Sequence, residues 1–356
     1  LREQHADFLK GSPFKETLKL TKKERKHEGL PPNKYYEREW ELTMNPVTGK
    51  PEPEKVLQLQ KQLRKRRTLR KTPGDALDNQ WVERGPNNIG GRTRVLLFDP
   101  NDSSNKRVFA GAVSGGLWVN DDITNENSSW TQVTEVPGNM NISCITVDPR
   151  DTNIWYVGTG EQYTFGAAVG NGVYKSSDGG ITWNQLNIVA EGPSDLTVGT
   201  SNLLEGVYYI NDIIAWDNGT NTEIFVGVGS HIYGDASSPN NILGPQSAGL
   251  YKSGDNGVSW SRVTSSELAF SSGNHTFYYI PNDLEIDADN RLWMGSISTP
   301  YFGTTGAGKV FCSLDGESWT LKKTLENSDR VELAMSQDDA NKIYALTEGY
   351  NPSDPH

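Results

Sequence analysis

The sequence predicts an all-β protein of the β-propeller class, in which four-stranded antiparallel sheets, the blades, surround an axis. Two observations carry this prediction. A short motif, Ser-x-Asp-x-Gly-x-x-Trp, occurs within residues 172–183 and 249–260, and again one residue shorter within 310–319. Between its copies, runs of alternating apolar and polar residues are separated by turn residues, a pattern typical of short antiparallel strands. Repeated sheets of this kind stack radially in propellers.

The repeat predicts about four and a half blades. Each complete blade has an inner strand ending in Asp, a second strand ending near Gly, a third strand that leads into the motif, and a fourth strand that begins at Trp. Complete blades are expected near residues 92–133, 142–186, 210–263 and 281–322, and a partial blade near 331–356. Long insertions interrupt blades two and three, and loops on a rigid scaffold commonly carry binding groups.

Ring closure is expected to involve an early strand. Trp81–Arg84 loosely matches the fourth-strand pattern, although no first three strands precede it. A propeller can complete its last blade with such a strand, which removes an exposed sheet edge. Four and a half blades do not close around Trp81, so the ring is expected to be incomplete and His356 not to be the natural end of the folded unit.

Residues 1–78 are expected to form a basic amino-terminal arm, and residues 79–356 the propeller. The net charge of −11 conceals two halves, because residues 1–78 hold 19 Lys and Arg against 12 Asp and Glu, whereas the remainder holds 15 against 33. A short amphipathic helix is expected near residues 54–70. Packing on the propeller is favoured for it over membrane-surface binding. An acidic body repels nucleic acid, so no nucleic-acid partner is expected.

No apolar run approaches the roughly 20 residues that a transmembrane helix needs, so no membrane span is expected. The two cysteines, Cys144 and Cys312, fall in different predicted blades, and no disulfide is expected between them.

The motif residues are expected to stabilise turns. Ser and Asp side chains accept backbone N–H bonds in turns, Gly adopts positive φ, and Trp packs between strands. The residues with these roles are Ser176, Asp178, Gly180, Trp183, Ser253, Asp255, Gly257, Trp260, Ser313, Asp315 and Trp319. A calcium site is the alternative use, but the dense Asp spacing of a calcium loop is absent. No metal site and no other cofactor are expected.

At these residues the chain resembles the Asp-box propellers, also called bacterial neuraminidase repeat (BNR) proteins. That group includes sialidases, xyloglucanase-like glycosidases, sortilin-like receptors and many non-enzymatic secreted proteins. Upstream, residues 34–40 and 81–94 resemble the opening of secreted Bacteroidetes propeller proteins. The resemblance implies a secreted or outer cell-surface protein that is cargo of the type IX secretion machinery.

Candidate catalytic residues are few. A sialidase needs an arginine cluster for the substrate carboxylate, and Arg92 and Arg94 stand at the first inner strand, but later inner strands offer no matching arginine. A xyloglucanase-like enzyme needs two carboxylates flanking a cleft. Glu161, Asp212 and Asp283 lie near the ends of strands and could face the axis. Turn-capping or solvated carboxylates are the favoured interpretation of these three residues.

Aromatic residues in the insertions favour binding over catalysis. Tyr163, Tyr233 and Tyr301 are the candidate binding residues, because aromatic rings stack on sugar faces and on protein side chains. The sequence therefore predicts a glycan- or protein-binding module. The alternative is a glycoside hydrolase, sialidase-like or xyloglucanase-like, that uses a carboxylate pair.

Overall fold

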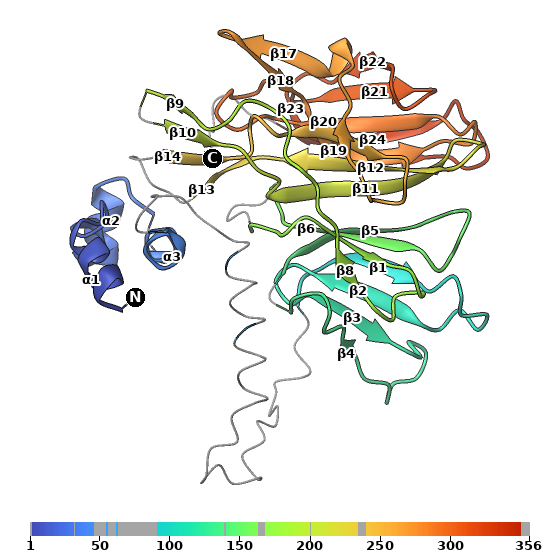
Figure 1. Cartoon of the computed structure of the whole chain (residues 1–356), viewed down its shortest axis with the longest axis horizontal. Coiled ribbons are helices and arrows are strands. Elements are labelled where there is room, and N and C mark those ends of the chain that lie inside the picture. Colours follow the sequence, from blue (N-terminus) through green and yellow to red (C-terminus); the bar gives the residue numbers. More distant parts are fainter. Residues whose placement is uncertain are drawn as a thin grey trace. The chain divides into compact units, whose positions relative to one another are not determined.

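The structure is a computed structural model that describes residues 2–31, 33–45, 55, 62, 91–138, 140–162, 168–199, 201–233 and 240–349. It divides into two compact units, Leu1–Arg92 and Thr93–His356, whose elements are labelled in Figure 1. We describe each unit separately. The predicted closing strand Trp81–Arg84 lies outside the described residues, as does the predicted helix at 54–70 apart from helical Lys55 and Gln62.

The second unit consists almost entirely of β-strands, which confirms the predicted fold class. Four antiparallel sheets have their strands in chain order, as blades of a propeller do. The first is β1(Thr93–Phe98), β2(Val108–Ala112), β3(Leu117–Asn120) and β4(Thr131–Gln132), and the second is β5(Ile142–Val147), β6(Trp155–Thr159), β7(Val173–Ser176) and β8(Asn184–Gln185). The third is β11(Tyr209–Asp217), β12(Thr222–Gly229), β15(Gly249–Ser253) and β16(Ser261–Arg262), and the fourth is β19(Ile280–Ile286), β20(Leu292–Ile297), β21(Lys309–Ser313) and β22(Trp319–Thr324). The hairpin β23(Ser328–Met335) and β24(Ile343–Gly349) follows as the start of a fifth, and a short pairing of β23 with β20 joins it to the fourth sheet.

The insertions fold into strands of their own, which the sequence did not predict. Residues of two insertions combine in a small sheet, in the order β13(His231–Tyr233), β14(Asn240–Leu243), β10(Ser201–Leu204) and β9(Leu196–Val198). Within it β10 and β14 are parallel. A further hairpin comprises β17(Ala269–Ser272) and β18(His275–Tyr278), after a short 3₁₀ helix at Ser266–Leu268.

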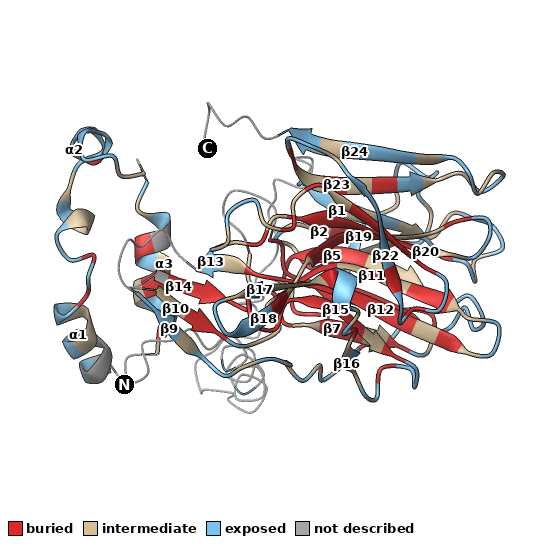
Figure 2. Ribbon diagram, turned by 90° about the horizontal axis from the view of Figure 1, so that it is seen from above, coloured by how far each residue is buried: buried red, intermediate tan, exposed pale blue. Residues whose placement is uncertain are grey.

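The apolar core lies between neighbouring blades. Figure 2 shows buried residues concentrated on strands such as β11, β12 and β20, whereas β24 is mostly exposed. One core cluster joins Tyr156 of the second blade to Ile210 and Val226 of the third. Another joins Phe225 of the third blade to Met294 and Phe311 of the fourth. Both clusters therefore span a seam between blades.

Every inner strand of the four blades contains a β-bulge at the same place. The bulge comes directly before the residue that pairs with a glycine of the second strand. The bulge residues are Arg94, Ser143, Asn211 and Asn282. A bulge re-aims the side chain of the extra residue, here towards the neighbouring blade.

Three of the bulge side chains donate a hydrogen bond to the backbone of the following blade. The bonds are Ser143 Oγ to the Ile210 carbonyl, Asn211 Nδ2 to the Pro281 carbonyl at 2.9 Å, and Asn282 Nδ2 to the Val331 carbonyl at 2.9 Å. Each bond satisfies a carbonyl at the seam that would otherwise be buried without a donor. Hydrogen bonds of the same kind thus join the second blade to the third, the third blade to the fourth, and the fourth blade to the hairpin β23–β24.

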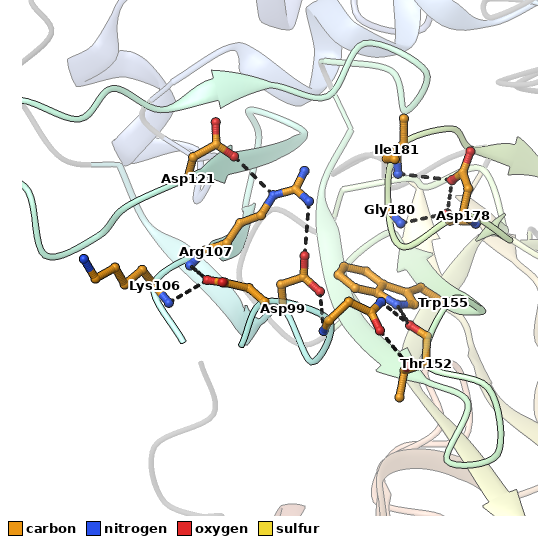
Figure 3. A network of polar contacts seen from close by, with 12 residues as sticks. Asp99, Lys106, Arg107, Asp121, Thr152, Trp155, Asp178, Gly180 and Ile181 are labelled. Carbon is orange, nitrogen blue, oxygen red and sulfur yellow. Dashed lines mark hydrogen bonds and ion pairs between the residues drawn. The ribbon is translucent and has the colours of Figure 1, made fainter. Parts of the chain in front are cut away.

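The motif forms a hydrogen-bonded turn in each of its three copies. Ser176 Oγ donates to Asp178 Oδ1 at 2.8 Å and accepts from the Gly180 N–H at 2.9 Å, and Asp178 Oδ1 accepts from the Ile181 N–H at 3.1 Å (Figure 3). Trp183 Nε1 donates to the Gly180 carbonyl at 3.0 Å. Equivalent Ser-to-Asp, Gly-to-Ser and Trp-to-Gly bonds occur in the other copies, at Ser253, Asp255, Gly257 and Trp260 and at Ser313, Asp315, Gly316 and Trp319.

Gly180→Ala is expected to destabilise the protein strongly. The φ of Gly180 is +82°, and a Cβ there would lie 2.9 Å from the rings of Phe109 and Trp155. Positive φ costs an L-residue about 1–2 kcal/mol, and overpacking adds typically 1–3 kcal/mol. The free energy of unfolding, measured in urea, should therefore fall by roughly 2–5 kcal/mol.

Gly179→Ala is the matched control for that variant. Its φ is +68°, but the nearest atom to an added Cβ is the amide nitrogen of the Asn101 side chain, at 3.2 Å. Gly179→Ala should lower the free energy of unfolding only by the cost of positive φ, about 1–2 kcal/mol. Equal losses for the two variants would contradict the packing role of Gly180 against the first blade.

The first unit contains three helices, α1(Arg2–Lys10), α2(Lys22–His27) and α3(Tyr35–Thr43), with a 3₁₀ turn at Thr17–Lys19. A capping box at Thr21 and Glu24 begins α2. The Trp40 ring packs on Phe8 and Phe14, with ring centroids 5.4 and 5.3 Å away. The sequence analysis expected an arm with one helix further along, and did not predict these three helices.

Candidate functional site

Glu161 lies two residues after the end of β6 and is held in a buried ion pair. Its side chain is 1 % exposed, and Oε1 lies 2.9 Å from Arg94 Nη2. Asn141 Nδ2 donates to Oε2 at 2.7 Å. Because Arg94 is the bulge residue of the first blade, this carboxylate joins the first inner strand to the second blade.

The next residue, Gln162, contacts two further blades. Its Oε1 accepts from Asn211 Nδ2 at 3.0 Å and from the Ser230 N–H at 3.1 Å, both in the third blade. Its Nε2 donates to the Ser298 carbonyl, which follows β20 of the fourth blade, at 3.5 Å. Glu161 and Gln162 therefore form a polar centre to which the first four blades all contribute.

Asp212 and Asp283 occupy equivalent positions beside this centre, one residue after the bulges of β11 and β19. Asp212 Oδ2 accepts from the Leu284 N–H at 2.7 Å, and Asp283 Oδ2 accepts from the Leu333 N–H at 2.5 Å. Each carboxyl thus bonds the inner strand of the next blade. Both side chains are half-buried.

These two carboxyls interact electrostatically. Burial, and then the charge of Asp283, raise the pKa of Asp212 well above its usual range. Burial raises the pKa of Asp283 to about 7, and the nearby Glu332 and Glu285 add to the rise while the backbone N–H bonds oppose it. Such a pair titrates as one system, and close to neutral pH it retains a proton. A carboxylic acid kept protonated beside a second carboxyl group is the arrangement that acid–base catalysis uses.

Several buried polar atoms of this region have no hydrogen-bond partner within the described residues. They are Asn141 Oδ1, Asn211 Oδ1, Asn282 Oδ1, Ser230 Oγ and Thr299 Oγ1. Buried acceptors without a donor are rare in folded proteins and commonly bind water or a ligand group. The centre can therefore accept hydrogen bonds from hydroxyl groups.

Of the predicted catalytic residues, the structure brings together Asp212 and Asp283, which interact electrostatically, whereas Glu161 pairs with Arg94 and Asn141. Arg92 is exposed and is the last residue of the first unit, so it is not placed with them. Tyr163 lies outside the described residues, and the side chain of Tyr233, in β13, is not described. Tyr301 is exposed on the loop after β20.

The sequence analysis missed Gln162, Asn211 and Asn282. A signal was present, since the dipeptide Asn-Asp opens the inner strands of blades three and four at Asn211 and Asn282. The aspartates were recognised and their asparagine neighbours were not, because alternation in a strand does not reveal a bulge.

The described residues contain no group of three or more His, Cys, Asp or Glu side chains arranged to hold a metal ion. In the same part of the chain, no helix is long and apolar enough to cross a membrane. Cys144 and Cys312 are both buried free thiols, and burial raises the pKa of each.

No family model matches the chain. Two curated proteins are similar to it. A xyloglucanase from a Paenibacillus species is 29% identical over 229 residues, covering 60% of this chain and 19% of that protein. A xyloglucanase from Hypocrea jecorina is 27% identical over 239 residues, covering 64% of this chain and 24% of that protein. The chain thus spans about a fifth to a quarter of the length of these relatives.

Solved structures of propeller-type proteins are also similar. The GH74 xyloglucanase from Xanthomonas campestris has 17% sequence identity and a TM-score of 0.44, covering 72% of this chain and 35% of that one. YCF48 from Cyanidioschyzon merolae has 13% identity and a TM-score of 0.40, covering 71% and 63%. The order of strands within the sheets, with the bulges and turns that repeat from sheet to sheet, makes the second unit a β-propeller assembly of four-stranded blades.

Proposed function

We propose that the chain is part of a secreted β-propeller glycoside hydrolase that acts on a neutral β-glucan, with xyloglucan as the substrate to test first. The observation that carries this proposal is the coupled carboxyl pair of Asp212 and Asp283, beside the polar centre of the inner strands. The two curated relatives named xyloglucanase support the same class of substrate. Secretion by the type IX route, which the sequence resemblance implies, belongs to this proposal.

A neutral substrate is favoured over a sialoside. A sialidase binds the substrate carboxylate with a cluster of arginines. The inner strands of blades two, three and four, Ile142–Val147, Tyr209–Asp217 and Ile280–Ile286, contain no arginine. Arg94 of the first blade is ion-paired with buried Glu161.

In the proposed reaction, the carboxyl that retains its proton near pH 7 donates that proton to the glycosidic oxygen as the bond breaks. The second carboxyl, once ionised, stabilises the positive charge that develops on the sugar ring or deprotonates the attacking water. Asp212, whose pKa burial and the charge of Asp283 raise well above the usual range, takes the role of the acid, and Asp283, whose pKa is about 7, takes the role of the ionised carboxyl. The buried amide and hydroxyl oxygens of the centre accept hydrogen bonds from sugar hydroxyls.

A binding module without catalysis is the second candidate, for a glycan or a protein ligand. A specific observation favours it: Asp212 and Asp283 already accept backbone N–H bonds across blade seams, and Glu161 is already paired. Carboxylates used in this way hold a fold together. This candidate matches the function that the sequence analysis favoured.

Release of reducing ends from xyloglucan, mixed-linkage β-glucan and a sialoside by the 356-residue chain distinguishes the two candidates. Turnover of xyloglucan is expected, and Asp283→Asn should reduce it by a factor of about 10²–10⁴, the usual contribution of a general acid or base. Glu332→Gln is the matched control, because it alters a neighbouring carboxylate that pairs with Arg330 on its own strand, at 3.9 Å, and it should retain activity. Its thermal unfolding and that of Asp283→Asn would show that both variants are folded.

Two results would overturn the hydrolase proposal. Binding of xyloglucan with no turnover would establish the binding module instead. Neither binding nor turnover on any of the three glycans would point to a protein ligand.

A further inference from the structure

Aromatic side chains gather on the hairpin β17–β18 and on the loop 298–308 that follows β20. We call Phe270, Phe277, Tyr279, Tyr301 and Phe302 the aromatic patch. The Phe270 ring stacks on Tyr279 with centroids 5.3 Å apart, and meets Phe302 edge-on at 5.3 Å. Phe302 also lies 4.6 Å from Phe277 and 5.1 Å from Tyr301. Figure 1 shows the strands of this hairpin in orange at the top of the view.

The patch rests on a rigid support. Tyr279 stacks on Phe311 of the fourth-blade core, with centroids 5.9 Å apart. The loop is closed by its own backbone, because the Thr299 N–H donates to Thr305 at 2.8 Å and the Phe302 N–H donates to Thr299 at 3.0 Å. A ligand bound here would therefore order little additional structure, which favours affinity.

Tyr301 has a partly exposed ring and a strained backbone conformation. Its φ is +80°, a region that L-residues seldom adopt, and its side chain remains 38% exposed. Strained backbone of this kind costs about 1–3 kcal/mol and occurs disproportionately at functional sites. The Tyr301 ring contacts Phe302 but is not buried, so packing of the core does not account for its position.

The loop also connects the patch to the polar centre. Its first residue, Ser298, accepts a hydrogen bond from Gln162, the residue after Glu161. Three residues further along the chain lies Tyr301. The loop that carries Tyr301 therefore begins at the polar centre.

We propose that the aromatic patch is a sugar-binding subsite in which the Tyr301 ring stacks on a pyranose ring of a β-linked glucan. A β-linked glucose unit presents flat faces of C–H bonds with its hydroxyl groups around the edge. Such a face fits an exposed aromatic ring, and the tyrosine hydroxyl can bond the hydroxyl groups. The ligand class rests on the proposed function, whereas the site itself rests on the geometry of the loop and hairpin.

Affinity electrophoresis in xyloglucan gels and calorimetry with cello-oligosaccharides would test this subsite in the full chain. Tyr301→Ala and Tyr301→Gly are each expected to weaken binding about tenfold or more, and Tyr301→Phe to stay within about threefold of the original protein, because the ring contributes most of the contact. Tyr301→Gly should also unfold at the same or a higher temperature, since glycine adopts φ of +80° without strain. If Tyr301→Gly keeps its thermal stability but loses affinity for glucan, the loss comes from recognition of the sugar and not from unfolding.

Tyr344→Ala provides the matched control, because Tyr344 is 66% exposed on β24, outside the patch. Its affinity for glucan should equal that of the unaltered chain. Affinity unchanged in Tyr301→Ala, or lost equally in Tyr344→Ala, would overturn the subsite. So would an unaltered chain that binds neither xyloglucan nor cello-oligosaccharides.

The subsite and the proposed hydrolysis can fail separately. If both hold, Tyr301→Ala raises KM for the polymer and leaves kcat nearly unchanged, whereas Asp283→Asn lowers kcat and leaves the affinity for glucan unchanged. Binding that depends on Tyr301 in a chain without turnover would support the subsite and overturn the hydrolase.

Discussion

Asp283→Asn is expected to stabilise the propeller at neutral pH and to make its stability less dependent on pH. Burial raises the pKa of Asp283 from 3.8 to about 7 in the folded protein. The folded state therefore binds the proton more tightly than the unfolded state, so this group contributes its stability fully below pH 3.8 and loses it as the pH rises towards 7. Asparagine stays neutral at every pH and retains an oxygen that can accept the Leu333 N–H bond.

Thermal unfolding between pH 4 and pH 8 measures this effect. Asp283→Asn should gain about 4 kcal/mol at pH 8, or roughly 8–16 °C for a unit of this size, and little at pH 4. The turn aspartates Asp178 and Asp255 have lowered pKa values and stabilise in the opposite sense, with loss below pH 4, but they are shared by both proteins. The difference in stability between the original protein and Asp283→Asn, followed across this pH range, therefore reports on Asp283 alone.

Asp212→Asn applies the same measurement to the second carboxyl of the pair. Because the charge of Asp283 raises the pKa of Asp212, removal of one carboxyl lowers the pKa of the other. The double variant should gain less than the sum of the two single variants. A gain at pH 8 equal to that at pH 4 for Asp283→Asn would contradict the raised pKa.

Glu37→Gln is expected to unfold the helical part of the first unit. Arg25 is 1% exposed and makes a bidentate ion pair with Glu37, with Nη1 to Oε2 at 2.8 Å and Nη2 to Oε1 at 3.0 Å. Its remaining donors bond the carbonyls of Pro31, Thr17 and Asn33 at 2.7, 2.9 and 3.2 Å. Glutamine leaves the guanidinium buried without a counter-charge, at a cost of about 3–5 kcal/mol.

Hydrogen exchange of the backbone amides in residues 2–45 measures that loss. Protection in α2 and α3 should disappear in Glu37→Gln, while the amides of the propeller strands keep theirs. Glu28→Gln is the control, because its side chain is 63% exposed and its contact with His27 is long, at 3.9 Å. Protection retained in Glu37→Gln would show that the ion pair does not hold these helices together.

The repeat made the blades predictable from the sequence because its signals are local. The turn of Ser176, Asp178 and Gly180 closes within five residues, so its pattern survives in any copy. The small sheet of β9, β10, β13 and β14 has no such signal, since β10 pairs in parallel with β14 almost forty residues away. The helical unit depends on Arg25 and Glu37, two charged residues that sequence analysis assigns to the surface.

The candidate site was only partly predictable. Glu161, Asp212 and Asp283 could be named as carboxylates near strand ends, but their partners could not, because each partner belongs to another blade. Gln162 gave no signal, being one polar residue in an insertion. Tyr301 was named for its chemistry, whereas its positive φ depends on the closed loop around it.

The bulge bonds between blades bear on how such a chain can evolve. Blades two, three and four each carry a donor side chain at the bulge that bonds a backbone carbonyl of the next blade, as Asn211 and Pro281 illustrate. A gene segment that encodes one repeat can therefore be duplicated or deleted, and the new neighbours will still match. The number of repeats can then change while the same hydrogen bonds form between neighbouring blades. The insertions can meanwhile vary in sequence and bind new ligands.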